Sequence, residues 1–102
     1  MFEIRETEAF ARVLKKLKDR RAVARITARI DRLRMGNPGD VKPVGKGVSE
    51  LRINYGPGYR VYYKQIGTTV IILLVAGDKS TQNTDIQLAQ RLAREYSGVQ
   101  SC

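Results

Sequence analysis

The segment SELRINYGPGYRVYY at residues 49–63 decides the fold, because it is typical of two strands that fold back on each other across a Gly-Pro-Gly turn. Gly56 and Gly58 are conformationally permissive and Pro57 fixes φ, so the geometry of this hairpin is encoded locally. Alternation places apolar side chains on one face, which belongs to a core: Leu51, Ile53, Tyr55, Val61 and Tyr63. The opposite face is polar and is the candidate working surface: Glu50, Arg52, Asn54, Arg60 and Tyr62.

Three further strands are expected around this hairpin. Residues 70–76 are apolar at every position, which predicts a strand covered on both faces at the centre of the sheet. Residues 41–44 predict a short edge strand, since Pro43 cannot donate to a central ladder. Alternating polarity over residues 2–5 predicts another short strand before the first helix.

Helical periodicity appears in three places. Thr7 can cap a first helix, whose apolar stripe has the spacing i, i+3, i+4, i+7: Phe10, Val13, Leu14 and Leu17. After a break at residues 19–21, a second helix is predicted by another stripe: Val23, Ile26, Ile30 and Leu33. Thr81 or Thr84 can cap a final helix with the apolar face Ile86, Ala89, Leu92, Ala93 and Tyr96. The sequence therefore predicts an α+β fold.

In this fold, an N-terminal helical hairpin packs on one face of a twisted, antiparallel-rich sheet of four to five strands, and a C-terminal helix closes the chain. The other face of the sheet is left to the polar residues. With 102 residues and 42% hydrophobic content, the chain allows one modest core. We take residues 1–96 as a single domain and residues 97–102 as a flexible C-terminal tail.

Composition restricts the function. The chain carries 19 Lys and Arg against 10 Asp and Glu, a net charge of +9, which favours a polyanionic partner such as nucleic acid or an acidic protein. There is no histidine, and Cys102 is the only cysteine, so the commonest general base and metal ligand are missing. We expect no cofactor and no metal. No signal-like or membrane-spanning apolar run is found, so a cytoplasmic protein is expected.

Most of the excess charge lies in the predicted helical hairpin, where residues 12–34 include ten Lys and Arg and two Asp. One interpretation is a solvated face. The other is a row of arginines at near i+4 spacing that follows a phosphate backbone and gives affinity without sequence specificity: Arg21, Arg25, Arg29 and Arg32. Lys42 and Lys46 extend this candidate RNA-binding set.

Three cations are the candidate catalytic residues. If neighbouring strands place Arg52 and Arg60 side by side, and the loop after the apolar strand brings Lys79 to the same end, their charges converge. Such a cluster suits a phosphodiester, because it stabilises charge on the non-bridging oxygens while the 2′-hydroxyl of RNA attacks in line.

Proton transfer has several candidates. Glu50 is either a general base or, as we favour, an ion-pair partner that orients Arg52 or its neighbour. Tyr62 lies on the arginine face and is a candidate for base stacking or for proton transfer.

Several ordered motifs together resemble one family: GNPGD at 36–40, the segment 47–63, the apolar strand, and GDKSTQ at 77–82. Over residues 2–96 the chain resembles the RelE/ParE superfamily of type II toxins, in the branch of addiction-module killer proteins similar to HigB-type toxins. The resemblance implies a RelE-like fold, ribosome-dependent cleavage of mRNA in the decoding site by a metal-independent endoribonuclease that inhibits translation, and neutralisation by a cognate antitoxin.

The resemblance also implies roles for individual residues. Arg60 matches the sheet arginine of the family, Lys79 matches its loop cation, and Arg52 lies near its basic strand residues. The helical arginines would contact ribosomal RNA. RelE has a tyrosine at the start of its last helix, where this chain has none, so Asp78, Asp85 and Tyr62 stay open for proton transfer.

Two other functions fit the same residues. A ParE-like toxin would poison DNA gyrase through a protein contact, without nuclease chemistry. A non-catalytic domain would use its cations only to position a nucleic acid or an antitoxin.

Overall fold

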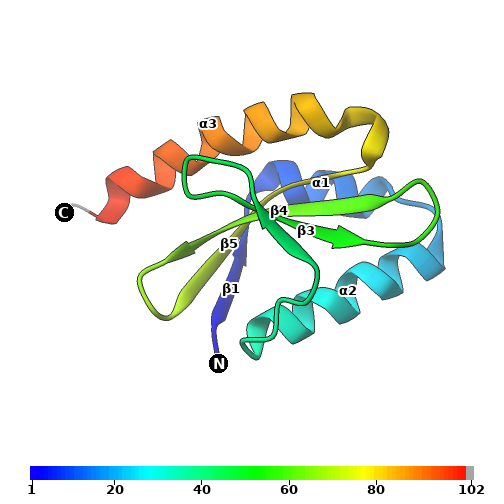
Figure 1. Ribbon diagram of the computed structural model, residues 1–102, viewed down its shortest axis with the longest axis horizontal. Helices are drawn as coiled ribbons and strands as arrows, with labels where there is room; N and C mark the ends of the chain where they lie inside the picture. The colour runs from blue at the N-terminus through cyan, green and yellow to red at the C-terminus, as the bar shows by residue number, and fades with distance from the viewer. Residues whose placement is uncertain (101–102) are drawn as a thin grey trace.

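The computed structural model describes the backbone of residues 1–100 and the side chains of residues 1–96 (Figure 1). It confirms the α+β fold class. The elements follow the chain in the order β1 (Glu3–Glu6), α1 (Glu8–Lys16), α2 (Arg20–Arg34), β2 (Val41–Pro43), β3 (Ser49–Ile53), β4 (Tyr59–Ile66), β5 (Val70–Gly77), the 3₁₀ turn η1 (Lys79–Thr81) and α3 (Gln82–Gln100).

The five strands form one sheet in the order β1-β5-β4-β3-β2. Strand β1 pairs with β5 in parallel, and the other neighbours are antiparallel. Residues 71–76 of β5 are all buried, which confirms that this strand is covered on both faces. The prediction that β5 lies at the centre of the sheet was wrong, because β4 is the middle one of the five strands. Only the short strand β1 lies outside β5. Strand β2, with Pro43, lies at the edge as expected.

Helices α1 and α2 cover one face of the sheet, α1 over β5 and α2 over β3 and β4. Thr7 caps α1 through its hydroxyl oxygen, which accepts from the Phe10 N–H, and its O–H donates to the Leu74 carbonyl at 2.6 Å. Asp19 caps α2 by accepting from two backbone N–H groups. The apolar face of the 49–63 hairpin packs here with residues of α1, α2 and β5, among them Phe10, Ile26, Leu33, Leu51, Val61 and Leu73.

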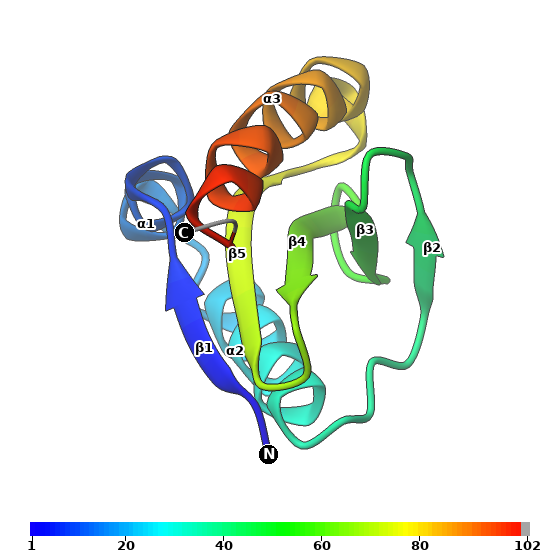
Figure 2. The ribbon, with the colours of Figure 1, turned by 90° about the vertical axis from the view of Figure 1, so that its left-hand side faces the viewer.

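Helix α3 covers part of the opposite face, as Figure 2 shows. Ala89 and Ala93 are buried against β4 and β5, where their small side chains allow the helix to approach the sheet closely. The prediction that the polar residues occupy this face was therefore incomplete. The apolar stripe of α3 also needs a surface to bury, and the sheet supplies it.

The start of α3 differs from the prediction. Asp78 caps the turn η1, where its carboxylate accepts from the Ser80 N–H at 2.8 Å, and η1 leads directly into α3. Thr81 and Thr84 therefore lie inside the helical segment and do not begin it. The backbone stays helical through Gln100, past the predicted domain end at Tyr96. Residues 101–102 of the predicted tail lie outside the described residues.

Candidate functional site

The end of the β3–β4 hairpin carries the predicted cations. Arg52 lies directly opposite Arg60 in the strand register, and Arg60 also pairs with Gly77 of β5. The Arg60 Nη1 donates to the Gly58 carbonyl at 2.6 Å. A Cβ built on Gly58 would lie 3.1 Å from this Nη1 and 3.7 Å from the Lys79 Cβ. The fold thus brings Arg60 and Lys79 to the same glycine, with Arg52 on the neighbouring strand.

Glu50 is the centre of a buried network behind these cations. Its side chain is 1% exposed. The carboxylate accepts from the Gln82 Nε2 at 2.8 Å, the Tyr62 hydroxyl at 3.0 Å and the Arg52 Nε at 3.3 Å. The Arg60 Nε lies 3.4 Å from the same carboxylate. Glu50 therefore holds both arginines, as the ion-pair interpretation expected.

The Glu50 network keeps this carboxylate charged. Burial alone would raise the pKa of Glu50, but hydrogen bonds from Gln82 and Tyr62 and the charge of Arg60 lower it below its ordinary value. Because the carboxylate is inaccessible and its oxygens are engaged, the general-base interpretation of Glu50 does not fit this geometry.

Tyr62 is fully buried, so the prediction that it stacks on a base was wrong. The strand alternation placed it correctly on the arginine face, but α3 covers that part of the face. Burial and the neighbouring Glu50 charge raise the pKa of Tyr62 far above its ordinary value. Its hydroxyl donates to Glu50 at 3.0 Å, and its full burial keeps it out of direct contact with a bound substrate.

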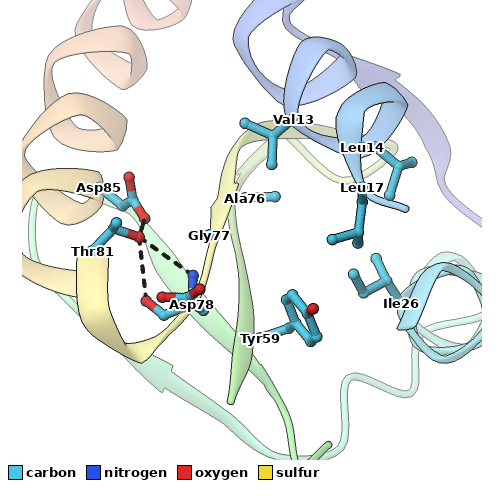
Figure 3. Close-up of a pocket in the computed structure, with 10 residues that line it drawn as sticks. All are labelled: Val13, Leu14, Leu17, Ile26, Tyr59, Ala76, Gly77, Asp78, Thr81 and Asp85. Carbon is cyan, nitrogen blue, oxygen red and sulfur yellow. Dashed lines mark hydrogen bonds between the residues drawn. The ribbon is translucent and has the colours of Figure 1, made fainter. Parts of the chain in front are cut away.

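The remaining acids, Asp78 and Asp85, lie at the end of β5 (Figure 3). The hydrogen bond from the Ser80 hydroxyl lowers the pKa of Asp78. Burial raises the pKa of Asp85, although the Thr81 hydroxyl donates to its carboxylate at 2.6 Å. Of the four residues predicted for proton transfer, Asp85 is the one whose pKa moves toward neutrality while it keeps partial exposure.

Gly77 is required by the packing of this acid corner. A Cβ there would lie 1.9 Å from the Asp85 Oδ2 and 2.8 Å from the Thr81 Oγ1. We expect Gly77→Ala to lower the free energy of unfolding by about 1–3 kcal/mol in urea melts, because it overpacks the corner. Adding Asp85→Ala should recover part of this loss, since the closest atoms are then absent, with Asp85→Ala alone as the control. A Gly77→Ala chain as stable as the wild type would contradict this packing.

A cavity of about 310 Å³ opens between the helical hairpin and the end of β5, and its walls are mostly apolar (Figure 3). Leu14 and Leu17 of α1, Ile26 of α2 and Tyr59 of β4 line it. Tyr59 also lines a smaller cavity, of about 190 Å³, that includes Arg52 and Arg60. Sequence reasoning missed this apolar cavity because its walls come from separate elements whose approach no local pattern encodes.

The arginines that were predicted to form a row on α2 have different surroundings in the structure. Arg29 donates to the backbone carbonyls of Arg52, Pro38 and Asp40, so it ties α2 to β3 and to the loop before β2. Arg29 is half-buried and part of its guanidinium is engaged with these carbonyls, whereas its predicted contact with RNA stays a prediction. Arg25 lies over the Tyr55 ring, with 4.7 Å from its Cζ to the ring centroid.

The other predicted RNA-binding residues are exposed: Arg21, Arg32, Lys42 and Lys46. Lys42 lies opposite Glu50 in the β2–β3 register, and Lys46 is in the loop that joins these strands. Lys42 and Lys46 therefore extend the positive surface along the edge of the sheet, away from Arg52 and Arg60.

Gln82 also belongs to the site, although no sequence pattern predicted it. It is the first residue of α3, and its amide reaches the carboxylate of Glu50 on β3. Its place at the end of the GDKSTQ motif was the available signal, but no spacing in the sequence shows that this helix start meets β3. Among the described residues, no group of three His, Cys, Asp or Glu side chains could hold a metal ion. Within residues 1–100, no helix is both long and apolar enough to cross a membrane.

Comparison with known proteins gives two findings. Residues 12–96 match the family described as phage-derived protein Gp49-like (DUF891). The chain is also similar to a protein of Haemophilus influenzae that is named only as uncharacterized. The two are 53% identical over 93 residues, which cover 91% of this chain and 94% of the relative.

Proposed function

Because the chain belongs to the Gp49-like family of phage-derived proteins, we propose that it is the toxin of a type II toxin-antitoxin system. The Gp49-like family is toxin-like and related to the RelE/ParE toxins. In this proposal the protein acts in the cytoplasm as a ribosome-dependent mRNA endonuclease, and a cognate antitoxin neutralises it.

The observation that carries this proposal is the arginine pair held by a buried carboxylate. Glu50, which is 1% exposed, accepts a hydrogen bond from the Arg52 Nε and forms an ion pair with Arg60, whose Nε lies 3.4 Å away without a hydrogen bond, and Lys79 lies at the same end of the sheet. Fixed guanidinium groups form paired hydrogen bonds to phosphate oxygens without reorganising during the reaction. They would stabilise the charge that develops on the non-bridging oxygens as the 2′-hydroxyl attacks.

Fewer side chains are available for proton transfer than the sequence suggested. With Glu50 engaged and Tyr62 kept protonated, Asp85 and Asp78 are the remaining side-chain candidates of the original four. In the proposed reaction the ribosome holds the mRNA in the geometry for in-line attack. Exposed cations on α2 and β2 would contact ribosomal RNA.

The proposal predicts a distinct pattern of RNA ends. Brief expression of the wild-type chain should arrest growth and produce new mRNA 5′ ends inside translated regions, detected by primer extension. The same transcript without its start codon should stay intact, because cleavage requires the ribosome. Lys79→Ala should reduce the new ends about tenfold or more, since it removes one cation from the site.

Two results would refute this function. Gyrase-dependent DNA breaks with intact mRNA would identify a gyrase poison. Normal growth at confirmed expression would identify a binding domain without this activity.

A further inference from the structure

One buried donor of the site has no hydrogen bond. The Arg60 Nε is enclosed, and no acceptor in the described part of the chain pairs with it. The Glu50 Oε2 lies 3.4 Å away, beyond the length of about 2.9–3.0 Å that is usual for a hydrogen bond from N–H to oxygen. A buried charged donor without a partner is costly and uncommon in native structures. The surroundings of this atom should therefore explain it.

The explanation lies in the Glu50 carboxylate, because its Oε2 is already occupied. Each carboxylate oxygen accepts about two hydrogen bonds. The Glu50 Oε2 accepts from the Gln82 Nε2 at 2.8 Å and from the Tyr62 hydroxyl at 3.0 Å. The Arg52 Nε donates to the other oxygen, Oε1. Gln82 and Arg60 therefore compete for one oxygen, and Gln82 holds it.

Of the two donors to this oxygen, Gln82 is the one that can be changed without disturbing Arg60 itself. Tyr62 is fully buried and lies on β4, the strand that also carries Arg60. Gln82 is only half-buried, and it is the first residue of α3. A change at Gln82 therefore alters the donors available to Glu50 and leaves the strand that carries Arg60 intact.

Gln82 also connects the two cationic parts of the site. Its backbone N–H donates to the Lys79 carbonyl in η1, and its side chain donates to Glu50 on β3. Lys79 is exposed, and Arg60 lines the cavity of about 190 Å³ together with Arg52. One residue thus links the turn that carries Lys79 with the carboxylate that pairs with Arg60.

We propose that Gln82 is a positioning residue for Arg60. By occupying the Glu50 Oε2, its amide keeps the Arg60 Nε out of a hydrogen bond with that oxygen. The ion pair then holds the guanidinium without drawing it against the carboxylate, so that the guanidinium stays at the cavity that it lines with Arg52. The consequence for cleavage rests on the proposed nuclease function, whereas the hydrogen bonding of Arg60 does not.

The first test follows the Arg60 Nε–H by heteronuclear NMR of the full chain, with Arg60→Lys to assign its signal. Gln82→Met removes the amide donor and keeps the length of the side chain. The Arg60 Nε–H proton should then move downfield and exchange more slowly with water, because it enters a hydrogen bond with the freed oxygen. An unchanged signal in a folded Gln82→Met chain would overturn the proposal.

The matched control is Gln87→Met, the same substitution at an exposed position of α3. It should leave the Arg60 signal in place. An equal movement of the signal in both variants would overturn the proposal, because the effect would then not depend on the donor to Glu50. Gln82→Ala, which also lacks the donor and favours a helix, is used if Gln82→Met does not fold.

The second test measures whether Gln82 and Arg60 share an acceptor. Urea midpoints of the wild type, Gln82→Met, Arg60→Lys and the double variant form a double-mutant cycle. In the wild-type background the Arg60 Nε replaces the lost donor, so Gln82→Met should lower the midpoint less than it does in the Arg60→Lys background. Equal losses in both backgrounds would show that the two side chains do not compete, and would overturn the proposal.

Cleavage separates this inference from the function. Gln82→Met should reduce the new mRNA 5′ ends by about tenfold, since a misplacement of about 1 Å in a site can cost about a hundredfold and the guanidinium moves by less. Gln87→Met should cleave like the wild type. Full cleavage by Gln82→Met would overturn the link between this hydrogen bond and the reaction.

The two failures are distinguishable. A wild-type chain that leaves mRNA intact, while the Arg60 signal moves in Gln82→Met, would refute the nuclease and keep the positioning role. A wild-type chain that cleaves mRNA, while the Arg60 signal stays unchanged in Gln82→Met, would refute the positioning role and keep the nuclease.

Discussion

Arg60→Ala is expected to lower mRNA cleavage by about 10²–10³-fold, the effect of removing one fixed donor that stabilises charge in a transition state. Arg60 is the most enclosed of the three cations, with 13% of its side chain exposed and its Nε facing Glu50. The Glu50 carboxylate and the Gly58 carbonyl fix its guanidinium before substrate arrives. Primer extension on a translated mRNA, after equal expression of each variant, measures the effect.

Two comparisons make the Arg60 result specific. Arg60→Lys keeps the charge but loses the planar paired donors, so it should recover only part of the cleavage. Arg5→Ala removes an arginine that is 63% exposed and far from the hairpin in sequence, and it should cleave like the wild type. Full cleavage by a folded Arg60→Ala chain would show that the site lies elsewhere. Urea melts of each variant separate lost chemistry from lost fold.

Glu50→Gln is expected to destabilise the fold by about 3–5 kcal/mol, the cost of removing one partner from a buried ion pair. Glu50 holds the Nε atoms of two arginines, and without its charge the enclosed Arg60 would be left uncompensated. Urea denaturation at neutral pH measures the loss. Glu8→Gln is the matched control, because Glu8 is 91% exposed in its pair with Arg12 and should change stability by less than about 1 kcal/mol.

The contribution of Glu50 to the stability of the fold should also depend on pH. The folded state lowers the pKa of Glu50 below its ordinary value of 4.5. Its contribution to stability is therefore present above that ordinary value and is lost as pH falls through the lower, folded pKa. The stability difference between wild type and Glu50→Gln should shrink in acid. A difference that stays constant to low pH would contradict an ionised Glu50.

Alternation along the hairpin was sufficient to predict the arginine pair. Period-two patterning determines which side chains share a face, and the short turn fixes the register that puts Arg52 opposite Arg60. The same pattern could not predict that Tyr62 is buried. Burial depends on what covers the face, and the covering residues, Ala89 and Ala93, lie on a helix far along the chain.

The arginines of α2 are a second example of contacts that the sequence could not predict. The spacing of the arginines predicted correctly that they lie along α2, but it could not distinguish the one that faces the loop before β2. Arg29 is engaged there because the carbonyls of Pro38 and Asp40 approach it in three dimensions. Gln82 was missed for the same reason, since its contact with Glu50 joins positions 32 residues apart.

The parallel pairing of β1 with β5 determines when this molecule can assemble during synthesis. Glu3 lies opposite Val70, so β1 cannot pair with β5 until the residues from Val70 onward have been made. Lys79 and Gln82 follow still later, and both belong to the corner that holds the arginines. Contacts across such long separations close slowly. A nascent chain therefore completes its cationic corner only after Gln82 has been made.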